Sequence, residues 1–246
     1  MKDNFSAQSN EYARFRPGYP PKLLEEICQL CSHFDCAWDC ATGNGQIAAA
    51  LSEHFRQIEA TDISENQLKN AIQKPNIHYQ VAAAEAAVFP PGIFDLVIVG
   101  QAAHWFDLEK FYPEVRRVLK PGGILALIGY NLLEIDVETD AVVQHLYSDV
   151  LGKYWDAERH LIETAYTTIP FPFPEIDFQE TAMCYEWRFD QLLGFLQTWS
   201  AVQHFTREQG FSPITESFIA ALRATWPENS LKTVEFPIFG RIGRSV

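Results

Sequence analysis

An acidic residue and a glycine turn together form the chain's first candidate ligand site. Asp39 ends an apolar run, and the small-residue turn after it contains Gly43 and Gly45. Glycine lets the backbone turn sharply and lets a ligand approach without an intervening side chain. Asp62 ends the next apolar run, and a carboxylate there could accept charge-assisted hydrogen bonds from both ribose hydroxyls of an adenosine. The pattern predicts a nucleotide-like ligand.

Two nucleotide-like ligands could fit this pattern, and they differ in the charge that they would place near Asp39. Residues Gly43 to Ala48 match the loose G-x-G-x-x-A pattern of nicotinamide dinucleotide sites. A pyrophosphate favours helix-terminal amides that no negative charge opposes, whereas Asp39 ends this strand. An anionic side chain in the crevice favours cationic groups, such as the ammonium and sulfonium of S-adenosylmethionine. The structural alternatives are a plain strand-to-helix turn and a solvent-facing Asp62 beside a helix cap.

The elements that must position these residues alternate between strand and helix. Ser64 and Gln67 suggest a capping box, Asp107 is the expected cap of a later helix, and Phe106 and Phe111 form its hydrophobic staple. Four helices are expected. The first covers 21–30, the second runs from the glycine turn to residue 55, the third covers 64–73, and the fourth begins at 107 and ends at KPGG. The expected strands cover 36–39, 57–62, 76–82, 94–100 and 124–130. Short connections predict an α/β fold with a doubly wound, mostly parallel sheet.

The regular alternation stops after residue 130. The segment 131–177 carries helical patterns and a proline-broken stretch that cannot be a central strand, so we expect a cap over the sheet. A strand at 178–187, helices at 190–204 and 213–225, and a last strand at 231–244 are expected to follow. We expect one domain over 1–246, with a lid segment at 1–34, a cofactor-binding core at 35–130, the cap at 131–177, and core strands and helices at 178–246.

Composition narrows the partners. The formal net charge of −13 argues against a nucleic acid, because phosphate binding needs clustered Lys and Arg. The first ten residues lack the apolar core of a signal peptide and no apolar run could span a bilayer, so we expect a cytoplasmic protein with no membrane partner, as a monomer or homodimer. Cys28 and Cys31 form a CxxC, but they share the apolar spacing of a helix. We expect structural thiols and no metal.

Five segments together resemble the class I S-adenosylmethionine-dependent methyltransferases. They are DCATGNGQ, ATDIS, the Ala84-Glu85 pair, FDLVIVGQAAHWFD and VLKPGGILAL. Three others, YARFRPGYP, YWDAERH and LQTWSAVQHF, are similar to the methyltransferase type 11 branch that contains the fungal trans-aconitate methyltransferases. The resemblance implies a seven-stranded Rossmann-like sheet whose last strand lies antiparallel beside the fifth.

The resemblance also implies contacts to S-adenosylmethionine and its product S-adenosylhomocysteine. It assigns Asp39, Ala41, Gly43 and Gly45 to the methionine end, Asp62 to the ribose, Ile63 to an adenine face, Ala84 and Glu85 to the adenine edge, Gln101 to the reactive methyl, and Tyr12 and Tyr19 to a lid. Ala41 stands where the family usually has glycine. Because alanine disfavours a positive φ, this departure could weaken cofactor affinity, although we expect it to be tolerated.

Methyl transfer from a sulfonium is an in-line displacement, so holding the reactants in line can supply about 7–11 kcal/mol. A general base is needed only if the acceptor is protonated at pH 7. His104 is the candidate base, because its segment follows the fourth strand; the alternative is that His104 and Trp105 only shape the crevice wall. A carboxylate acceptor would instead require an arginine clamp, for which Arg16 and Arg159 are candidates.

Aromatic residues of the cap and the later helix, including Trp155 and Trp199, could roof an apolar acceptor pocket. We therefore expect S-adenosylmethionine-dependent methyl transfer to a small molecule, with oxygen, and a carboxylate in particular, as the accepting group. The two alternatives are an NAD-dependent oxidoreductase and a non-catalytic S-adenosylmethionine-binding protein.

Overall fold

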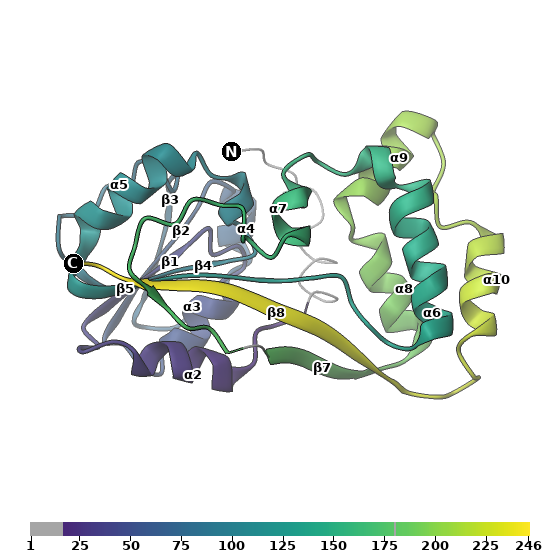
Figure 1. The fold of residues 1–246 in the computed structure, drawn as a ribbon, viewed down its shortest axis with the longest axis horizontal. Coiled ribbons are helices and arrows are strands. Elements are labelled where there is room, and N and C mark those ends of the chain that lie inside the picture. Colours follow the sequence, from purple (N-terminus) through teal and green to yellow (C-terminus); the bar gives the residue numbers. More distant parts are fainter. Residues whose placement is uncertain (1–16, 180) are drawn as a thin grey trace.

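The computed structural model describes residues 17–179 and 181–246, which form an α/β fold around one sheet (Figure 1). Its strands are β1 (Cys36–Cys40), β2 (Gln57–Asp62), β3 (Ile77–Val81), β4 (Phe94–Gly100), β5 (Leu119–Tyr130), β6 (Glu175–Ile176), β7 (Thr181–Trp187) and β8 (Lys232–Arg244). Their order is β3-β2-β1-β4-β5-β8-β6, with β7 also paired to β8. Strands β1 to β5 are parallel, and β8 is antiparallel to β5. This confirms the predicted Rossmann-like fold with its antiparallel last strand.

The sheet has one strand more than the seven expected. The added strand is the two-residue β6, which follows the proline-broken stretch and pairs with β8 at the sheet edge. An edge position tolerates nearby prolines, because one side of the strand needs no ladder hydrogen bonds. β8 itself has three partners: its first half pairs with β7, and its second half pairs with β5 on one side and β6 on the other.

Helices cover both faces of the parallel part of the sheet. The helices are α2 (Pro21–Gln29), α3 (Gln46–Leu51), α4 (Glu65–Lys69), α5 (Leu108–Val118), α6 (Val137–Gln144), α7 (Arg159–Glu163), α8 (Phe189–Gln197), α9 (Ser200–Gln209) and α10 (Glu216–Ala224). Alternate residues of β4 face opposite sides, as the strand period of two requires. Leu96 and Ile98 pack with α2 and α3, whereas Val97 and Val99 pack with α5.

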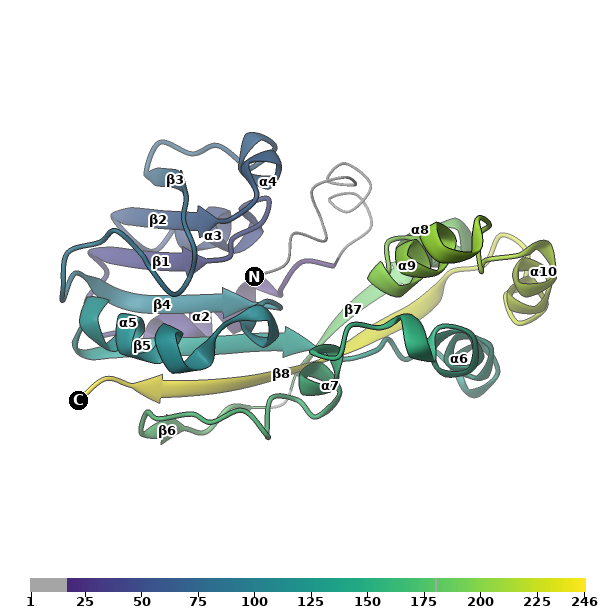
Figure 2. The same ribbon diagram turned by 90° about the horizontal axis from the view of Figure 1, so that it is seen from above.

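Four helices, α6, α8, α9 and α10, gather at one end of the molecule, away from α2, α3 and α5 (Figures 1 and 2). They pack near β7 and the first half of β8, with α8 against β7 and α6 against α10. In the segment 178–246, β7 and β8 belong to the sheet, whereas α8, α9 and α10 lie with α6 of the cap. The single helix expected at 190–204 is two helices, and the break lies at Thr198 and Trp199, which cap α8 and α9.

Two local expectations need correction, and a third, Asp107 as the cap of the later helix, is confirmed in position. KPGG does not end a helix, because α5 ends at Val118 and β5 already begins at Leu119. Helix α4 ends at Lys69 rather than at residue 73; Ser64 caps it, accepting from the Gln67 N–H at 3.3 Å. Asp107 occupies the N-cap of α5 without a side-chain capping bond among the described residues.

The staple beside that cap is confirmed, since the rings of Phe106 and Phe111 lie 4.8 Å apart. Within the described part of the chain, none of the helices is long and apolar enough to cross a membrane. The five cysteines are free thiols, and over the same residues no cluster of His, Cys, Asp or Glu has the arrangement of a metal site.

Candidate functional site

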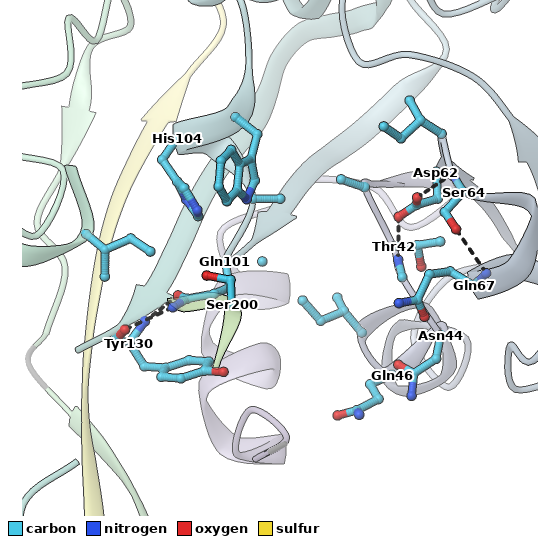
Figure 3. A pocket seen from close by; sticks show the side chains of 18 of the residues that line it. Thr42, Asn44, Gln46, Asp62, Ser64, Gln67, Gln101, His104, Tyr130 and Ser200 are labelled. Carbon is cyan, nitrogen blue, oxygen red and sulfur yellow. Dashed lines mark hydrogen bonds between the residues drawn. The ribbon is translucent and has the colours of Figure 1, made fainter. Parts of the chain in front are cut away.

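A pocket lies where the carboxyl ends of the central parallel strands meet the cap (Figure 3). It is lined by the glycine turn after β1, by residues 62–64 after β2, by residues 100–102 after β4 and by Tyr130 at the end of β5. Residues from the cap close the opposite side. Open parallel sheets bind ligands at this edge, where the order of the strands reverses.

Asp39 lies beneath the turn, and its side chain does not reach the pocket surface formed by the described residues. It is 1% exposed, and its Oδ2 accepts hydrogen bonds from Thr42 Oγ1 at 2.5 Å and from the Ala48 N–H at 2.8 Å. Its other oxygen is buried and has no hydrogen-bond partner among the described residues. Burial raises the pKa of Asp39 to about 7. The site therefore holds an unsatisfied acceptor directly below the turn.

The turn has three residues in the left-handed region. Ala41, Gly43 and Gly45 have φ values of 59°, 57° and 79°. A Cβ on Gly43 would meet no described atom within 4 Å, so the turn is open to the pocket there. A Cβ on Gly45 would lie 2.2 Å from the hydroxyl oxygen of Tyr79. Packing inside the protein thus requires Gly45, whereas Gly43 leaves space for a ligand.

Asp62 is held at the pocket wall by two backbone groups. Its Oδ2 accepts from the Gly43 N–H at 2.9 Å, and its Oδ1 accepts from the Ser64 N–H at 2.8 Å (Figure 3). The second bond occupies the N–H that a complete capping box would have joined to Gln67. Each carboxylate oxygen can accept a further hydrogen bond. Ile63 lines the pocket beside it.

Gln101 joins the ends of β4 and β5. It has a φ of 53°, and its side-chain amide donates to the Tyr130 carbonyl at 3.1 Å and accepts from the Tyr130 N–H at 2.8 Å (Figure 3). Ala84 and Glu85, by contrast, lie outside the pocket as its described lining defines it. Ala84 is buried, and Glu85 accepts from the Asp107 N–H at 2.9 Å.

The candidate acceptor residues that the structure describes come together. His104, Trp105, Trp155, Arg159 and Trp199 all line the pocket. Tyr19 lines it too, and its hydroxyl donates to the Ile128 carbonyl at 3.4 Å. Tyr12 and Arg16 lie outside the described residues.

Aromatic rings hold the guanidinium of Arg159. The Arg159 Cζ lies 4.9 Å from the ring centroid of Trp155 and 5.5 Å from that of Tyr147, whose hydroxyl accepts from Nε at 3.0 Å. The Trp155 and Trp199 rings are 5.4 Å apart. None of the carboxylates in the described ranges forms an ion pair with Arg159. Neutral groups therefore hold the guanidinium in place. Because no described carboxylate neutralises its positive charge, it could pair with an anionic ligand.

His104 is neutral at pH 7 in this environment. Its side chain is 6% exposed, and its Nδ1 lies 3.0 Å from the hydroxyl oxygen of Tyr166. Burial, and to a lesser degree the charge of Arg159, lower the pKa of His104 to about 3. A group with so low a proton affinity is a weak base.

Sequence reasoning missed three residues that shape this site. Thr42 bonds to Asp39, Tyr147 supports Arg159, and Tyr166 contacts His104. Thr42 sits inside the recognised turn, so its hydroxyl was a usable signal. The two tyrosines belong to no motif, and only the folded cap brings them to the pocket.

Comparisons with known proteins agree on one family. Residues 38–127 match a family model described as a methyltransferase domain. The chain is 31% identical to a protein of Dictyostelium discoideum named as a methyltransferase, over 96% of this chain and 93% of that protein. A solved structure from Anaeromyxobacter dehalogenans, described as a type II methyltransferase, is 40% identical and has a TM-score of 0.86. That similarity covers 94% of this chain and 98% of the other.

Proposed function

The chain belongs to the class I S-adenosylmethionine-dependent methyltransferases, and on that premise we propose that it methylates a carboxylate oxygen of a small molecule. The family assignment replaces the two alternatives, an NAD-dependent oxidoreductase and a non-catalytic binding protein. The observation that carries the proposal is the ordered guanidinium of Arg159 in the same pocket as Asp62.

The residues at the sheet edge fit the cofactor. When bound, S-adenosylmethionine supplies an electrophilic methyl group on a sulfonium. In this proposal Asp62 accepts hydrogen bonds from the ribose, the open backbone at Gly43 allows close approach, and Ile63 packs on the adenine. Asp39, with its buried unpartnered oxygen, favours the cationic methionine end from below. Ala84 and Glu85 remain proposed contacts of the adenine edge.

The opposite end of the pocket suits a small carboxylate. Arg159 would pair with the carboxylate, and Trp155, Trp199 and Ile162 offer apolar walls that exclude water. Asp156 also lines this end, and its negative charge favours one carboxylate there over several. A carboxylate is already ionised at pH 7, so no base is needed. The protein's task is to hold the oxygen in line with the methyl group.

The remaining parts of the proposal rest on composition and resemblance. A net charge of −13 favours a small-molecule partner over a nucleic acid, and we keep a cytoplasmic location and a monomer or homodimer as proposals. The likeness to the trans-aconitate branch stays a prediction.

The direct test uses purified protein, methyl-labelled S-adenosylmethionine and matched sets of carboxylic acids, their amides, amines and thiols. We expect labelled products only from the acids, and we expect mild alkali to release the label as methanol, because esters hydrolyse and ethers do not. A labelled amine or thiol with no labelled acid would overturn the proposal.

The matched variants are Arg159→Gln and Arg56→Gln, the second at an exposed arginine that pairs with Asp35. A charged hydrogen bond is worth about 1.5–3 kcal/mol, so Arg159→Gln should raise the acceptor KM at least tenfold. Binding of S-adenosylhomocysteine should change little in either variant. An unchanged acceptor KM in Arg159→Gln would remove the clamp from the proposal.

A further inference from the structure

Tyr166 is buried against the wall of the pocket in a costly backbone conformation. Its side chain is 0% exposed, and Ala165 and Tyr166 have consecutive φ values of 50° and 57°. Non-glycine residues adopt this region only where the surroundings over-determine it. Here the Tyr166 N–H donates to the Leu161 carbonyl at 2.9 Å, and its ring packs edge-on against Phe239 at 4.9 Å. The chain thus ends α7 by directing Tyr166 beneath His104.

The hydroxyl of Tyr166 has one hydrogen-bond partner among the described residues. Nδ1 of His104 lies 3.0 Å away. Burial raises the pKa of Tyr166, and the nearby backbone N–H groups of His104 and Ala103 lower it. Ala103 and His104 begin the short 3-10 helix η2 (Ala103–Trp105), and the first N–H groups of a helix have no partner within it. The Tyr166 hydroxyl therefore lies beside the start of this helix, where it contacts the side chain of His104.

A phenolic hydroxyl has two lone pairs and one proton. Among the described residues, Nδ1 of His104 is the acceptor that lies within hydrogen-bond distance of this buried hydroxyl. A buried donor without an acceptor is costly, so the proton goes to Nδ1. We infer that Tyr166 is a positioning residue: its hydroxyl donates to Nδ1 of His104 and so fixes the imidazole proton on Nε2, which makes His104 a hydrogen-bond donor to the methyl acceptor.

This tautomer complements the rest of the pocket. Nε2 is on the opposite side of the ring from Nδ1. His104 lines the pocket (Figure 3), and Arg159 lines the same pocket. An N–H and a guanidinium together match an anionic acceptor with two oxygens. A protonated Nε2 cannot take a proton from the acceptor, so the arrangement replaces the general-base role considered for His104. The role of His104 toward the acceptor rests on the proposed function, whereas its tautomer does not.

The tautomer can be measured without any acceptor. The ring nitrogens of 15N-histidine-labelled protein, complexed with S-adenosylhomocysteine, would be recorded by NMR from pH 5.5 to 8.5, with His104→Gln to assign the signals. We expect Nε2 to be protonated and Nδ1 unprotonated throughout. A proton on Nδ1, or titration of His104 within this range, would overturn the inference whatever the acceptor is.

Tyr166→Phe removes the donor, and Tyr112→Phe is the matched control. The Tyr112 hydroxyl is buried in the same aromatic cluster and has no hydrogen-bond partner among the described residues. One neutral hydrogen bond corresponds to about a two- to tenfold change in an equilibrium. Tyr166→Phe should therefore lower the ratio of Nε2-protonated to Nδ1-protonated His104 by about that factor, and Tyr112→Phe should leave the ratio unchanged. Equal effects of the two variants would show that the hydroxyl does not set the tautomer.

Kinetics separate the donor from a base. The side-chain nitrogen of Gln can take the place of Nε2–H but cannot act as a base, so His104→Gln should keep clearly more kcat/KM for the acceptor than His104→Ala. Equal loss in both variants would contradict the donor role. If the tautomer holds but no carboxylic acid is methylated, the proposed substrate class fails while the positioning role of Tyr166 stands.

Discussion

Ala41 carries backbone strain that a glycine would relieve. Its φ of 59° lies in the left-handed region, which costs an L-residue about 1–2 kcal/mol. Ala41→Gly removes this strain, although the more flexible unfolded chain takes back about 0.4–1 kcal/mol. We expect the free energy of unfolding, measured by urea denaturation, to rise by about 0.5–1 kcal/mol. Affinity for S-adenosylhomocysteine should be equal or higher.

The control is the same chemical change in a right-handed segment. Ala49 lies inside α3 and is partly buried, where glycine in place of alanine costs about 0.5–1 kcal/mol. Opposite signs for Ala41→Gly and Ala49→Gly would establish strain at the turn. A loss of stability in both variants would show that the left-handed φ of Ala41 does not destabilise the folded protein.

Asp39 gives stability a pH dependence whose sign follows from its burial. Burial raises the pKa of Asp39 from 3.8 to about 7, while Thr42 and Ala48 lower it. Because the folded pKa lies above the unfolded one, stability from the protonated carboxyl is fully present below about pH 4 and is lost as the pH rises to about 7. Within that window the loss is roughly 1.4 kcal/mol per pH unit.

The measurement compares wild type with Asp39→Asn, which does not titrate. We expect the free energy of unfolding of the wild type to fall relative to the variant between pH 5 and 7, and the difference to level off above that. Asp190→Asn, at an exposed carboxylate on α8, should follow the wild type. Parallel curves for wild type and Asp39→Asn would mean that Asp39 is ionised throughout.

Residues with a local signal could be predicted, and those defined by distant contacts could not. Asp39, Gly43 and Asp62 stand at the ends of apolar runs, so their place at the sheet edge follows from strand order. Tyr166 carries no such signal, because its role depends on His104 from another element. A tyrosine near a proline-rich stretch gives no hint that its hydroxyl contacts a histidine 62 residues earlier in the sequence.

At the scale of elements, Gln101 holds the ends of two strands together. Its amide makes two hydrogen bonds to the backbone of Tyr130, so Gln101→Leu leaves a donor and an acceptor of β5 without these partners. Each lost partner costs about 1–3 kcal/mol where the group stays buried. We expect thermal denaturation to show a loss of at least about 1 kcal/mol and calorimetry to show weaker S-adenosylhomocysteine binding.

Gln57→Leu is the matched control, since Gln57 is exposed at the start of β2. Exposed substitutions usually change stability by less than about 0.5 kcal/mol. If Gln101→Leu behaved like Gln57→Leu in both measurements, the bridge between β4 and β5 would be dispensable.

Helices and strands with a continuous pattern of apolar residues could be predicted from the sequence, whereas the residues at which elements begin and end were predicted less well. The apolar run of β4 fits a strand buried on both faces, and the structure buries it from Phe94 to Val99. KPGG misled because glycine and proline usually end helices, whereas here they lie inside β5, which pairs with β4 through a register shift. The break between α8 and α9 has no glycine or proline to announce it; it depends on Trp199, which turns into the pocket wall.

At the scale of the whole molecule, β8 ties the cap to the sheet. Its residues 232–238 pair with β7 beside the cap helices, and its residues 238–244 pair with β5 of the parallel core. If either β5 or β7 separated from β8, backbone N–H and C=O groups of β8 would lose their hydrogen-bond partners. The core and the cap should therefore unfold together, in one transition seen equally by far-UV circular dichroism and tryptophan fluorescence.

Phe236 is the side chain on β8 at which this coupling can be tested. It is fully buried, and its ring lies 5.6 Å from Tyr130 of β5, 5.5 Å from Trp187 of β7 and 5.2 Å from Phe195 of α8. Replacing a buried Phe by Ala costs about 3–5 kcal/mol.

We expect Phe236→Ala to lower the single transition as a unit, with both probes shifting by the same amount. Leu222→Ala is the control, because Leu222 is buried in α10 at the far side of the cap and lies away from the shared strand. If the coupling holds, this variant too should lower both probes together. Should either variant instead split the unfolding into two transitions, the cap would be an independently unfolding unit, and β8 would not couple it to the cofactor core.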